Sequence, residues 1–255
     1  MIDMHTHILY GVDDGPQTIE GTLQMLKAAV EEGITDLIVT PHAYHPKYTV
    51  KRDAIHRQIN ELIDSVKQLG YPLRLHSGQE IHLHEHLVEN LLSGEAMTLA
   101  KSRYLLLELP FYTVPAYTFQ IIQTLIENGY TPIIAHPEKN RAIAENPNIL
   151  NRLILQGAHA QITAGSLTGH FGRHIQKTAM QLVQANLIHC YGSDAHNVSS
   201  RPFEYSKGLI MLEKKVHYEL ITVLLENNRR ILNDEAFTIL EPANIMPKKW
   251  WGLIG

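Results

Sequence analysis

Short apolar runs alternate with amphipathic segments along almost the whole chain, and this alternation restricts the fold class. Seven runs, each bounded by turn residues, have the length and composition of buried strands: Met1–His5, Asp36–Thr40, Leu73–Gly78, Tyr104–Glu108, Pro132–Ala135, Ala158–Thr163 and Leu187–Tyr191. Between them, apolar residues recur at helical spacing, as in Ile19, Leu23, Leu26 and Val30 and again in Ile55, Ile59, Leu62 and Val66. Strands that alternate with helices predict a parallel sheet, either closed into a barrel or open and doubly wound.

The length of the chain agrees with one α/β unit. It has 255 residues, and barrels of alternating strands and helices often occupy about this length. Hydrophobic residues make up 44% of the sequence, which is enough for a sizeable core. Because no linker, low-complexity tract or fixed-period repeat interrupts the pattern, we expect a single domain over residues 1–255.

The charge pattern argues against a nucleic-acid or membrane partner. The net charge is −4 with neutral histidine, and the sequence has neither a basic run nor a basic amphipathic helix. No apolar run approaches the roughly 18–20 residues that span a bilayer, and Asp3 and His5 interrupt any stretch like a signal peptide. The only cysteine, Cys190, cannot form an intrachain disulfide, so we expect a reducing, cytoplasmic location.

Histidine and acidic residues gather where the predicted strands end. The sequence has 16 histidines, and eight strand-end residues stand out: His5, His7, His42, Glu80, Glu108, His136, Asp194 and His196. Parallel barrels build their active sites at the C-terminal ends of their strands. Residues two apart on an extended segment point the same way, so His5 with His7, and Asp194 with His196, can each hold an ion from one side. The pattern therefore predicts a metal centre at the barrel mouth.

The alternative is that these residues are structural. A lone histidine at a strand end is usually structural, and Asp or Glu there often caps the next helix. The whole set is different, because without metal its carboxylates would repel one another and its imidazoles would be poorly solvated. We therefore favour the metal centre.

The chain resembles the PHP (polymerase and histidinol phosphatase) superfamily in segments that follow the family's order: MIDMHTHILYGVDDG, TPHAYHP, GQEI, LLELP, AHPE and GSDAHNVSSRPF. More narrowly, it is similar to the manganese-dependent protein-tyrosine phosphatases encoded with bacterial capsule and exopolysaccharide genes. The resemblance implies a distorted (β/α)7 barrel of the PHP fold, with three divalent ions in its site. It also implies a tyrosine-phosphorylated protein as substrate, on the tyrosine-rich tail of a polysaccharide-assembly tyrosine autokinase, and thereby regulation of capsule or exopolysaccharide synthesis.

The resemblance assigns nine ligands to the three ions. The first ion would be held by His5, His7, Glu80 and Asp194. Glu80 would bridge to a second ion, which is also held by Glu108 and His136. The third would be held by Asp14, His42 and His196. Carboxylate and imidazole ligands without thiolate suit Mn²⁺ or Fe²⁺ and are compatible with Mg²⁺ or Zn²⁺. Independently of the family, nine candidate ligands are too many for one ion but suit two or three.

The charges of such a cluster point to an anionic substrate. Three divalent ions bring six positive charges, and the four carboxylates of Asp14, Glu80, Glu108 and Asp194 return four negative ones. The remaining charge of about two would be neutralised by a phosphoryl dianion but not by a neutral peptide or ester. Neighbouring metal ions can clamp attacking and leaving oxygens and can activate water. The hypothesis is direct attack of a metal-bound hydroxide on phosphorus, without a phosphoenzyme.

Three basic residues are candidates for phosphate binding. Arg201 matches an arginine that the family uses near the phosphate, and a guanidinium binds phosphate oxygens in pairs. In the segment HPEKNRA, relatives commonly have arginine directly after the glutamate, where this chain has Lys139. Arg141 lies two residues further on. Lys139 and Arg141 both remain candidates, although a lysine cannot reproduce the bidentate fork of an arginine.

Several weaker signals surround the site. Tyr44 and Tyr48, or Phe111 and Tyr112, are candidates for stacking on a phenyl ring. The histidines of HLHEH, residues 82–86, are expected on an exposed loop and helix start. The segment AGSLTGHFG lacks the P-loop pattern, so ATP use is not expected, but it is a candidate lining of the cleft.

Cys190 argues against a cysteine-dependent phosphatase. Such enzymes need an arginine six residues after the nucleophile, and that position is His196. The thiol is therefore expected in the core.

Other functions are left open. A small-molecule phosphatase related to the histidinol phosphatases would share the fold. Amidohydrolases also begin with H-x-H on a barrel strand, but they often bridge their metals with a modified lysine, whereas Glu80 and Glu108 occupy the corresponding strands here. A non-catalytic metal-holding module that binds the kinase, and a homo-oligomer, are further alternatives.

Overall fold

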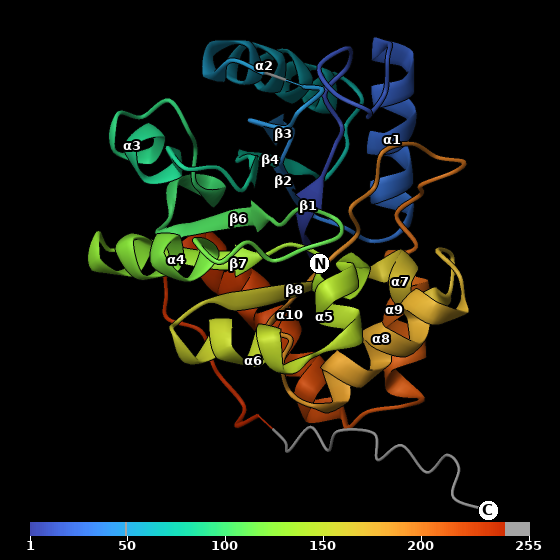
Figure 1. Cartoon of the computed structure of the whole chain (residues 1–255). Helices are drawn as coiled ribbons and strands as arrows, with labels where there is room; N and C mark the ends of the chain where they lie inside the picture. The colour runs from blue at the N-terminus through green and yellow to red at the C-terminus, as the bar shows by residue number, and fades with distance from the viewer. Residues whose placement is uncertain (49, 243–255) are drawn as a thin grey trace, which may run out of the picture.

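The computed structural model describes residues 1–48 and 50–242, which fold around one curled parallel sheet (Figure 1). Its strands are β1 (Ile2–Thr6), β2 (Asp36–Val39), β3 (His42–Ala43), β4 (Arg74–Ser77), β5 (Glu80–His82), β6 (Tyr104–Glu108), β7 (Thr131–Ile134), β8 (His159–Thr163) and β9 (Cys190–Gly192). Every strand pair is parallel. The hydrogen-bonded strands form two sets, one of three strands in the order β1-β2-β4 and one of six strands in the order β3-β5-β6-β7-β8-β9.

The nine strands occupy the seven positions that the sequence predicts. β3 resumes the path of β2 after the break at Thr40–Pro41, and β5 resumes that of β4 after Gly78–Gln79. The first and last strands then meet at their C-terminal ends, where Asp194 N donates to His5 O and His7 N donates to Ala195 O, both at 2.9 Å. The expected distorted (β/α)7 barrel is confirmed.

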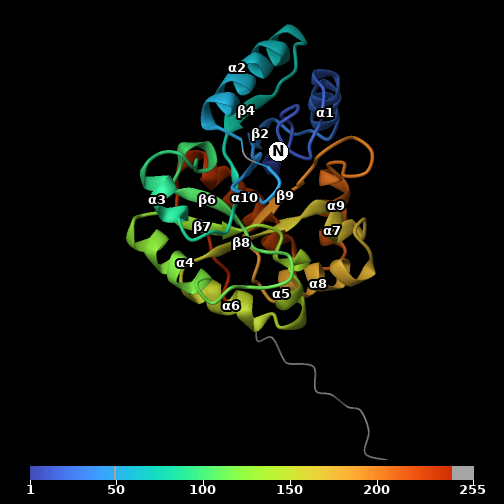
Figure 2. The ribbon, with the colours of Figure 1, turned by 45° about the horizontal axis from the view of Figure 1, so that its top comes forward.

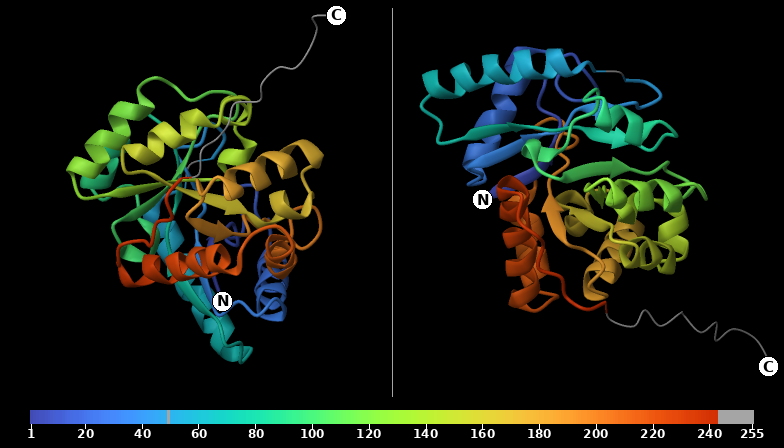
Figure 3. Two further views of the ribbon diagram at one scale, coloured as in Figure 1. Left: turned by 90° about the horizontal axis from the view of Figure 1, so that it is seen from below. Right: turned by 90° about the vertical axis from the view of Figure 1, so that its left-hand side faces the viewer.

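Helices cover the outside of the sheet. The α-helices are α1 (Ile19–Glu31), α2 (Arg52–Gln68), α3 (Leu87–Leu92), α4 (Thr118–Glu127), α5 (Arg141–Glu145), α6 (Asn148–Leu155), α7 (Ala164–Thr168), α8 (Arg173–Gln184), α9 (Tyr205–Glu213) and α10 (Tyr218–Asn233). Two 3₁₀ turns, η1 (Leu99–Lys101) and η2 (Pro137–Lys139), complete the set. Figures 2 and 3 show α1 and α2 on one side of the sheet and α4, α6 and α8 on another.

The core has two apolar layers. The larger lies between strands and helices, and α2 contributes the face that its sequence predicts, with Ile55, Ile59, Leu62 and Val66 all buried. The smaller lies inside the barrel and includes Met4, Ile38, Leu106, Ile133 and Cys190. Because apolar side chains fill the barrel below, polar groups concentrate at the C-terminal mouth.

Two expectations from the sequence apply to the whole chain. No helix among the described residues is long and apolar enough to cross a membrane. A single domain over residues 1–255 stays a prediction, because residues 243–255 lie outside the described part.

Candidate metal centre

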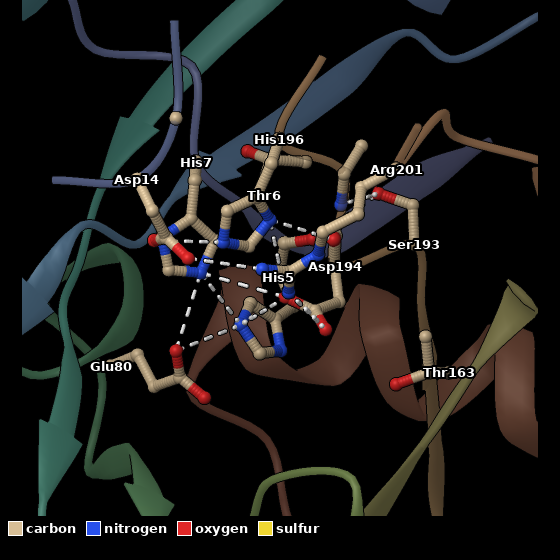
Figure 4. A network of polar contacts seen from close by, with 12 residues as sticks. His5, Thr6, His7, Asp14, Glu80, Thr163, Ser193, Asp194, His196 and Arg201 are labelled. Carbon is tan, nitrogen blue, oxygen red and sulfur yellow. Dashed lines mark hydrogen bonds and ion pairs between the residues drawn. The ribbon is translucent and has the colours of Figure 1, made fainter. Parts of the chain in front are cut away.

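All nine predicted ligands come together at the mouth of the barrel. Figure 4 shows part of this cluster, with His5, His7, Asp14, Glu80, Asp194 and His196. They lie at or just beyond the ends of β1, β6, β7 and β9, in β3, at the start of β5 and, for Asp14, in the loop after β1. Three groups have ligand atoms within 4.8 Å of one another: His7, Asp14, His42 and His196; His5, His7 and Glu80; and His42, Glu80 and Glu108. Because the groups share members, the geometry suits several neighbouring ions better than one.

Glu80 is the centre of this cluster. Its Oε2 lies 3.4 Å from His5 Nε2, 3.2 Å from His7 Nε2 and 3.1 Å from His42 Nδ1. Its other oxygen, Oε1, lies 2.8 Å from His136 Nε2. Glu80 is only 1% exposed. A buried carboxylate with imidazoles on both oxygens has the position of a bridging ligand.

Aspartates complete the cluster on either side of Glu80. Asp194 Oδ1 lies 3.4 Å from His5 Nε2. Asp14 Oδ1 lies 3.1 Å from His196 Nε2 and 3.4 Å from His42 Nε2. Imidazole nitrogens therefore face carboxylate oxygens throughout the site.

These contacts shift the ionisation of the cluster. Burial alone would lower the pKa of His7, but the charge of Asp13, the hydrogen bond with Asp13 and the close carboxylate of Glu80 raise it to about 9. Burial opposes protonation of His42 too, yet the charge of Glu80 and the close carboxylates of Asp14 and Glu80 raise its pKa to about 11. Burial would raise the pKa of Glu80, but the charges of His5 and His42 hold it well below its usual range. The carboxylate of Glu80 is thus ionised and able to bind cations.

Two residues that the sequence analysis did not single out orient the histidines. Asp13 Oδ2 accepts from His7 Nδ1 at 2.9 Å and from the backbone N of His42 at 3.1 Å. Gln161 Oε1 lies 3.1 Å from His5 Nδ1. In each case the partner leaves Nε2 of the imidazole facing the cluster, which is how metal-binding histidines are usually held. The double aspartate in GVDDG was the available signal for Asp13.

Backbone strain accompanies two of the candidate ligands. His136 has φ 32° and Asp194 has φ 55°, so both lie in the left-handed region. Residues other than glycine adopt this region rarely, and such strain concentrates at functional sites. The expectation that Asp194 and His196 project from one extended segment is therefore wrong, although both still face the cluster. The left-handed turn, rather than strand alternation, directs the Asp194 side chain inward.

The structure separates the three basic candidates. Lys139 Nζ donates to Asp194 Oδ2 at 2.5 Å, and Arg201 Nη2 donates to the same oxygen at 3.1 Å. Arg201 Nη1 also donates to Asp14 Oδ2 at 3.1 Å. Arg141 instead pairs with Glu145 at 2.9 Å, is 66% exposed, and does not appear among the described residues that line the cleft. Only Lys139 and Arg201 lie where a bound anion could meet them.

Buried atoms without partners test whether metal ions fit here. His42 Nδ1, Glu80 Oε2 and His196 Nε2 are buried, and none makes a hydrogen bond of good geometry with the described residues, although His42 Nδ1 lies 3.1 Å from Glu80 Oε2 and His196 Nε2 lies 3.1 Å from Asp14 Oδ1. Unsatisfied polar atoms of this kind are costly. Divalent cations would satisfy all three atoms at once, and the imidazole and carboxylate donors are ligand types that such cations accept. The residues present therefore fit a metal cluster.

The cluster opens into a cleft of about 410 Å³. Candidate ligands, Lys139 and Arg201 form one part of its lining, and Leu109, Phe111, Phe171 and Ile175 form an apolar part. Phe171 belongs to the AGSLTGHFG segment, so this candidate segment contributes one residue to the cleft lining.

The other aromatic candidates lie outside this lining. Tyr112 packs edge-on against Phe111, and Tyr44 stacks on His84. Tyr48 stacks on His45 with 5.0 Å between ring centroids. In the HLHEH segment, His86 is exposed as expected, but His82 is half-buried and its Nδ1 lies 3.1 Å from Glu108 Oε2. His82 therefore supports a candidate ligand, because β5 extends further than the sequence indicates.

Known proteins are similar to this chain in sequence and in fold. CapC of Staphylococcus aureus is 39% identical over 257 residues, with 100% of each chain covered. The tyrosine-protein phosphatase YwqE of Bacillus subtilis (strain 168) is 38% identical over 252 residues, 99% of each chain. A solved structure comes from work on YwqE and on CpsB of Streptococcus pneumoniae, which are described as metal-dependent tyrosine phosphatases. It is 38% identical to this chain with a TM-score of 0.94, and the match covers 97% of this chain and 100% of the other.

More distant structures share the fold alone. Dihydropyrimidinase from Brevibacillus agri is 11% identical with a TM-score of 0.53, and the match covers 95% of this chain and 73% of that one. The family model for capsular polysaccharide synthesis proteins of the CpsB/CapC type matches residues 1–233. These findings confirm the resemblance seen in the sequence, and the chain belongs to the CpsB/CapC family.

Proposed function

We propose that this chain is a metal-dependent protein-tyrosine phosphatase that hydrolyses phosphotyrosine in a protein substrate. The observation that carries the proposal is the Glu80-centred cluster, which lies beside Lys139 and Arg201 in one cleft. The full-length similarity to the tyrosine-protein phosphatase YwqE supports the same reaction. A neutral amide would leave the cations of this site without a counter-charge, so the geometry supports a phosphate ester over an amidohydrolase substrate.

Nine residues form the proposed ligand set: His5, His7, Asp14, His42, Glu80, Glu108, His136, Asp194 and His196. Their mixed imidazole and carboxylate chemistry supports Mn²⁺, with Fe²⁺, Mg²⁺ or Zn²⁺ as compatible substitutes. When bound, such ions supply Lewis-acid stabilisation of phosphoryl oxygens and activation of the attacking water. The three overlapping ligand groups support a cluster of three ions.

The protein's own groups then bind and orient the substrate. Arg201 offers a planar guanidinium for paired contacts with phosphoryl oxygens, and Lys139 adds a second positive charge. Asp13 and Gln161 fix the rings of His7 and His5, so that the ligand geometry does not reorganise during the reaction. Because most of the ligand residues are buried, a phosphoryl group bound among them would be shielded from bulk water.

The charge of the cleft makes metal necessary for substrate binding as well as for chemistry. Four carboxylates face it, from Asp14, Glu80, Glu108 and Asp194, against the two cations Lys139 and Arg201. Without ions, protons on His7 and His42 balance the two excess carboxylate charges at pH 7, so no net positive charge remains to attract a phosphoryl dianion. Removing the metal should therefore weaken substrate binding and not only slow turnover.

The proposed substrate is a phosphotyrosine on the tyrosine-rich tail of a polysaccharide-assembly tyrosine autokinase, met in the cytoplasm. Membership of a capsular polysaccharide synthesis family supports this partner. Dephosphorylation of the tail would regulate capsule or exopolysaccharide synthesis.

Phosphate release from a tyrosine-phosphorylated peptide tests the function. Protein loaded with Mn²⁺ is expected to release phosphate, and a chelator is expected to stop the release. Histidinol phosphate serves as the comparison substrate. A much higher kcat/KM for histidinol phosphate would assign the chain to small-molecule phosphatases, and kinase binding without any turnover would assign a non-catalytic role.

Arg201 and Arg141 offer a matched pair of variants for the phosphate-binding role. Arg201→Ala is expected to lower kcat/KM by about 100-fold, because it removes a charged donor that faces the reacting phosphoryl group. Arg141→Ala removes the same side chain from an exposed pair with Glu145 and should leave kcat/KM within about twofold. Metal content, measured by elemental analysis, should stay unchanged in both. An equal loss in the two variants would contradict the assignment.

Cys190 should be dispensable for catalysis. It is fully buried inside the barrel, and burial raises the pKa of its thiol well above the usual value. Cys190→Ala is expected to leave kcat/KM within about twofold while lowering the free energy of unfolding by about 1 kcal/mol, because it removes one buried sulfur atom. Kinetic assays and denaturant melts measure the two effects separately. A hundredfold loss of activity in a folded variant would restore the thiol as a candidate nucleophile.

A further inference from the structure

The apolar part of the cleft lining has no role in holding ions or phosphate. Leu109 and Phe111 follow β6, whereas Phe171 and Ile175 come from the segment that leads into α8 and from its first turn. These four side chains share one cleft with the candidate ligands and with Lys139. A site for inorganic phosphate alone would not need such a surface. Clefts that bind organic ligands characteristically combine apolar lining with a few polar anchors.

Phe171 is held in place from two sides. A Cβ atom added to Gly165 in α7 would lie 2.9 Å from Phe171 Cε2, so the ring fits only because that position is glycine. On the cleft side, Lys139 Nζ lies 4.4 Å from the centroid of the Phe171 ring, within the range of a cation–π contact. The adjacent His170 bonds through Nε2 to Ser200 O at 2.6 Å. The ring is therefore fixed before any ligand enters.

Phe111 provides the outer part of the same apolar surface. It lines the cleft and is 58% exposed, a large exposed fraction for phenylalanine. Exposed apolar surface beside a polar site commonly marks a place that a ligand covers. Its neighbour Tyr112 is 66% exposed but does not appear in the lining, so the two aromatic residues of this loop differ in position.

We propose that Phe171 and Phe111 form an aryl subsite, which recognises the phenolic ring of a phosphate monoester. The proposal rests on the phosphatase function given above. Lys139 contacts both Asp194 and the Phe171 ring, so a phosphoryl group held at Lys139 lies next to the apolar surface. A phenyl ring on its ester oxygen can reach this surface and gain aromatic and apolar contacts that a serine or threonine side chain is too short and too narrow to make. Phe171 and Phe111 thus determine specificity for aryl over alkyl esters.

Binding of two phosphonates to the Mn²⁺-loaded protein tests the aryl subsite without requiring turnover. Calorimetry should show that the wild type binds phenylphosphonate about 10-fold more tightly than methylphosphonate. Phe171→Leu, which keeps an apolar residue but removes the ring, should reduce this preference to about threefold or less and leave methylphosphonate affinity unchanged. Tyr112→Ala, the matched exposed aromatic outside the lining, should keep the full preference.

Two results would overturn the aryl subsite. The preference for phenylphosphonate could persist in Phe171→Leu and in the double variant with Phe111→Ala. Alternatively, affinity for both phosphonates could fall equally, which would show that Phe171 acts only by positioning Lys139. Failure of the phosphatase function is separate, because it would appear as an aryl preference without release of phosphate from phosphotyrosine peptide.

Discussion

Replacing Glu80 with glutamine is expected to abolish the hydrolysis of phosphotyrosine peptide, with a loss of kcat/KM of about 10³-fold or more. The substitution keeps the shape of the side chain but removes the charge that four imidazoles surround, those of His5, His7, His42 and His136. A bridging ligand that becomes neutral should release ions from both positions that it joins. A 10³-fold loss corresponds to about 4 kcal/mol of transition-state stabilisation.

Two measurements separate this effect from misfolding. Elemental analysis should show less bound metal in Glu80→Gln, while circular dichroism should show an intact fold. Glu89→Gln is the matched control, because Glu89 also pairs with a histidine, His86 Nδ1 at 3.0 Å, but on the exposed surface. It should keep full activity and metal content. Normal turnover in Glu80→Gln would contradict the proposed ligand set.

The fold was predictable because the pattern of buried residues follows the period of each element. For α2, the predicted apolar face is the buried face. For α1, only Leu26 of the four predicted residues is fully buried, and the buried face consists of Thr22, Met25, Leu26 and Ala29. Thr22 Oγ1 donates to Ile8 O at 2.7 Å, and this tertiary hydrogen bond ties that face of the helix to the segment after β1. Such a bond depends on a distant backbone atom and leaves no local signal.

The site was predictable to the extent that topology decides it. Parallel strands bring their C-terminal ends together, so residues as distant as His5 and Asp194 meet without any local signal between them. Positions that depend on turns were not accessible in this way. Lys139 and Arg141 are two residues apart, yet the turn η2 directs only Lys139 into the cleft. Asp13 was missed because its role depends on the orientation of the His7 ring.

Metal binding should strengthen steeply with pH, because ions and protons compete for the same imidazoles. Without ions, the pKa of His7 is raised to about 9 and that of His42 to about 11, so both rings carry protons at pH 7. Ligation needs neutral imidazole, so loading must release both protons. The overall constant for loading the two ions that His7 and His42 would hold is therefore expected to rise by about 100-fold per pH unit between pH 6 and 7.5, tenfold for each proton displaced. Calorimetry in buffers with different ionisation enthalpies counts the protons directly.

The free energy of unfolding of the metal-free protein should instead fall as the pH rises. A raised histidine pKa stabilises the folded state fully below the unfolded value of about 6.5, and this contribution is lost as the pH rises through about 9 for His7. Metal-loaded protein should therefore become more stable as the pH rises, whereas the metal-free protein should become less stable. Asp13→Asn removes the charge that holds the proton on His7, so it should reduce the number of protons released by about one. Unchanged release in that variant, or a pH-independent affinity in the wild type, would show that the histidines do not take part as ligands in the way proposed.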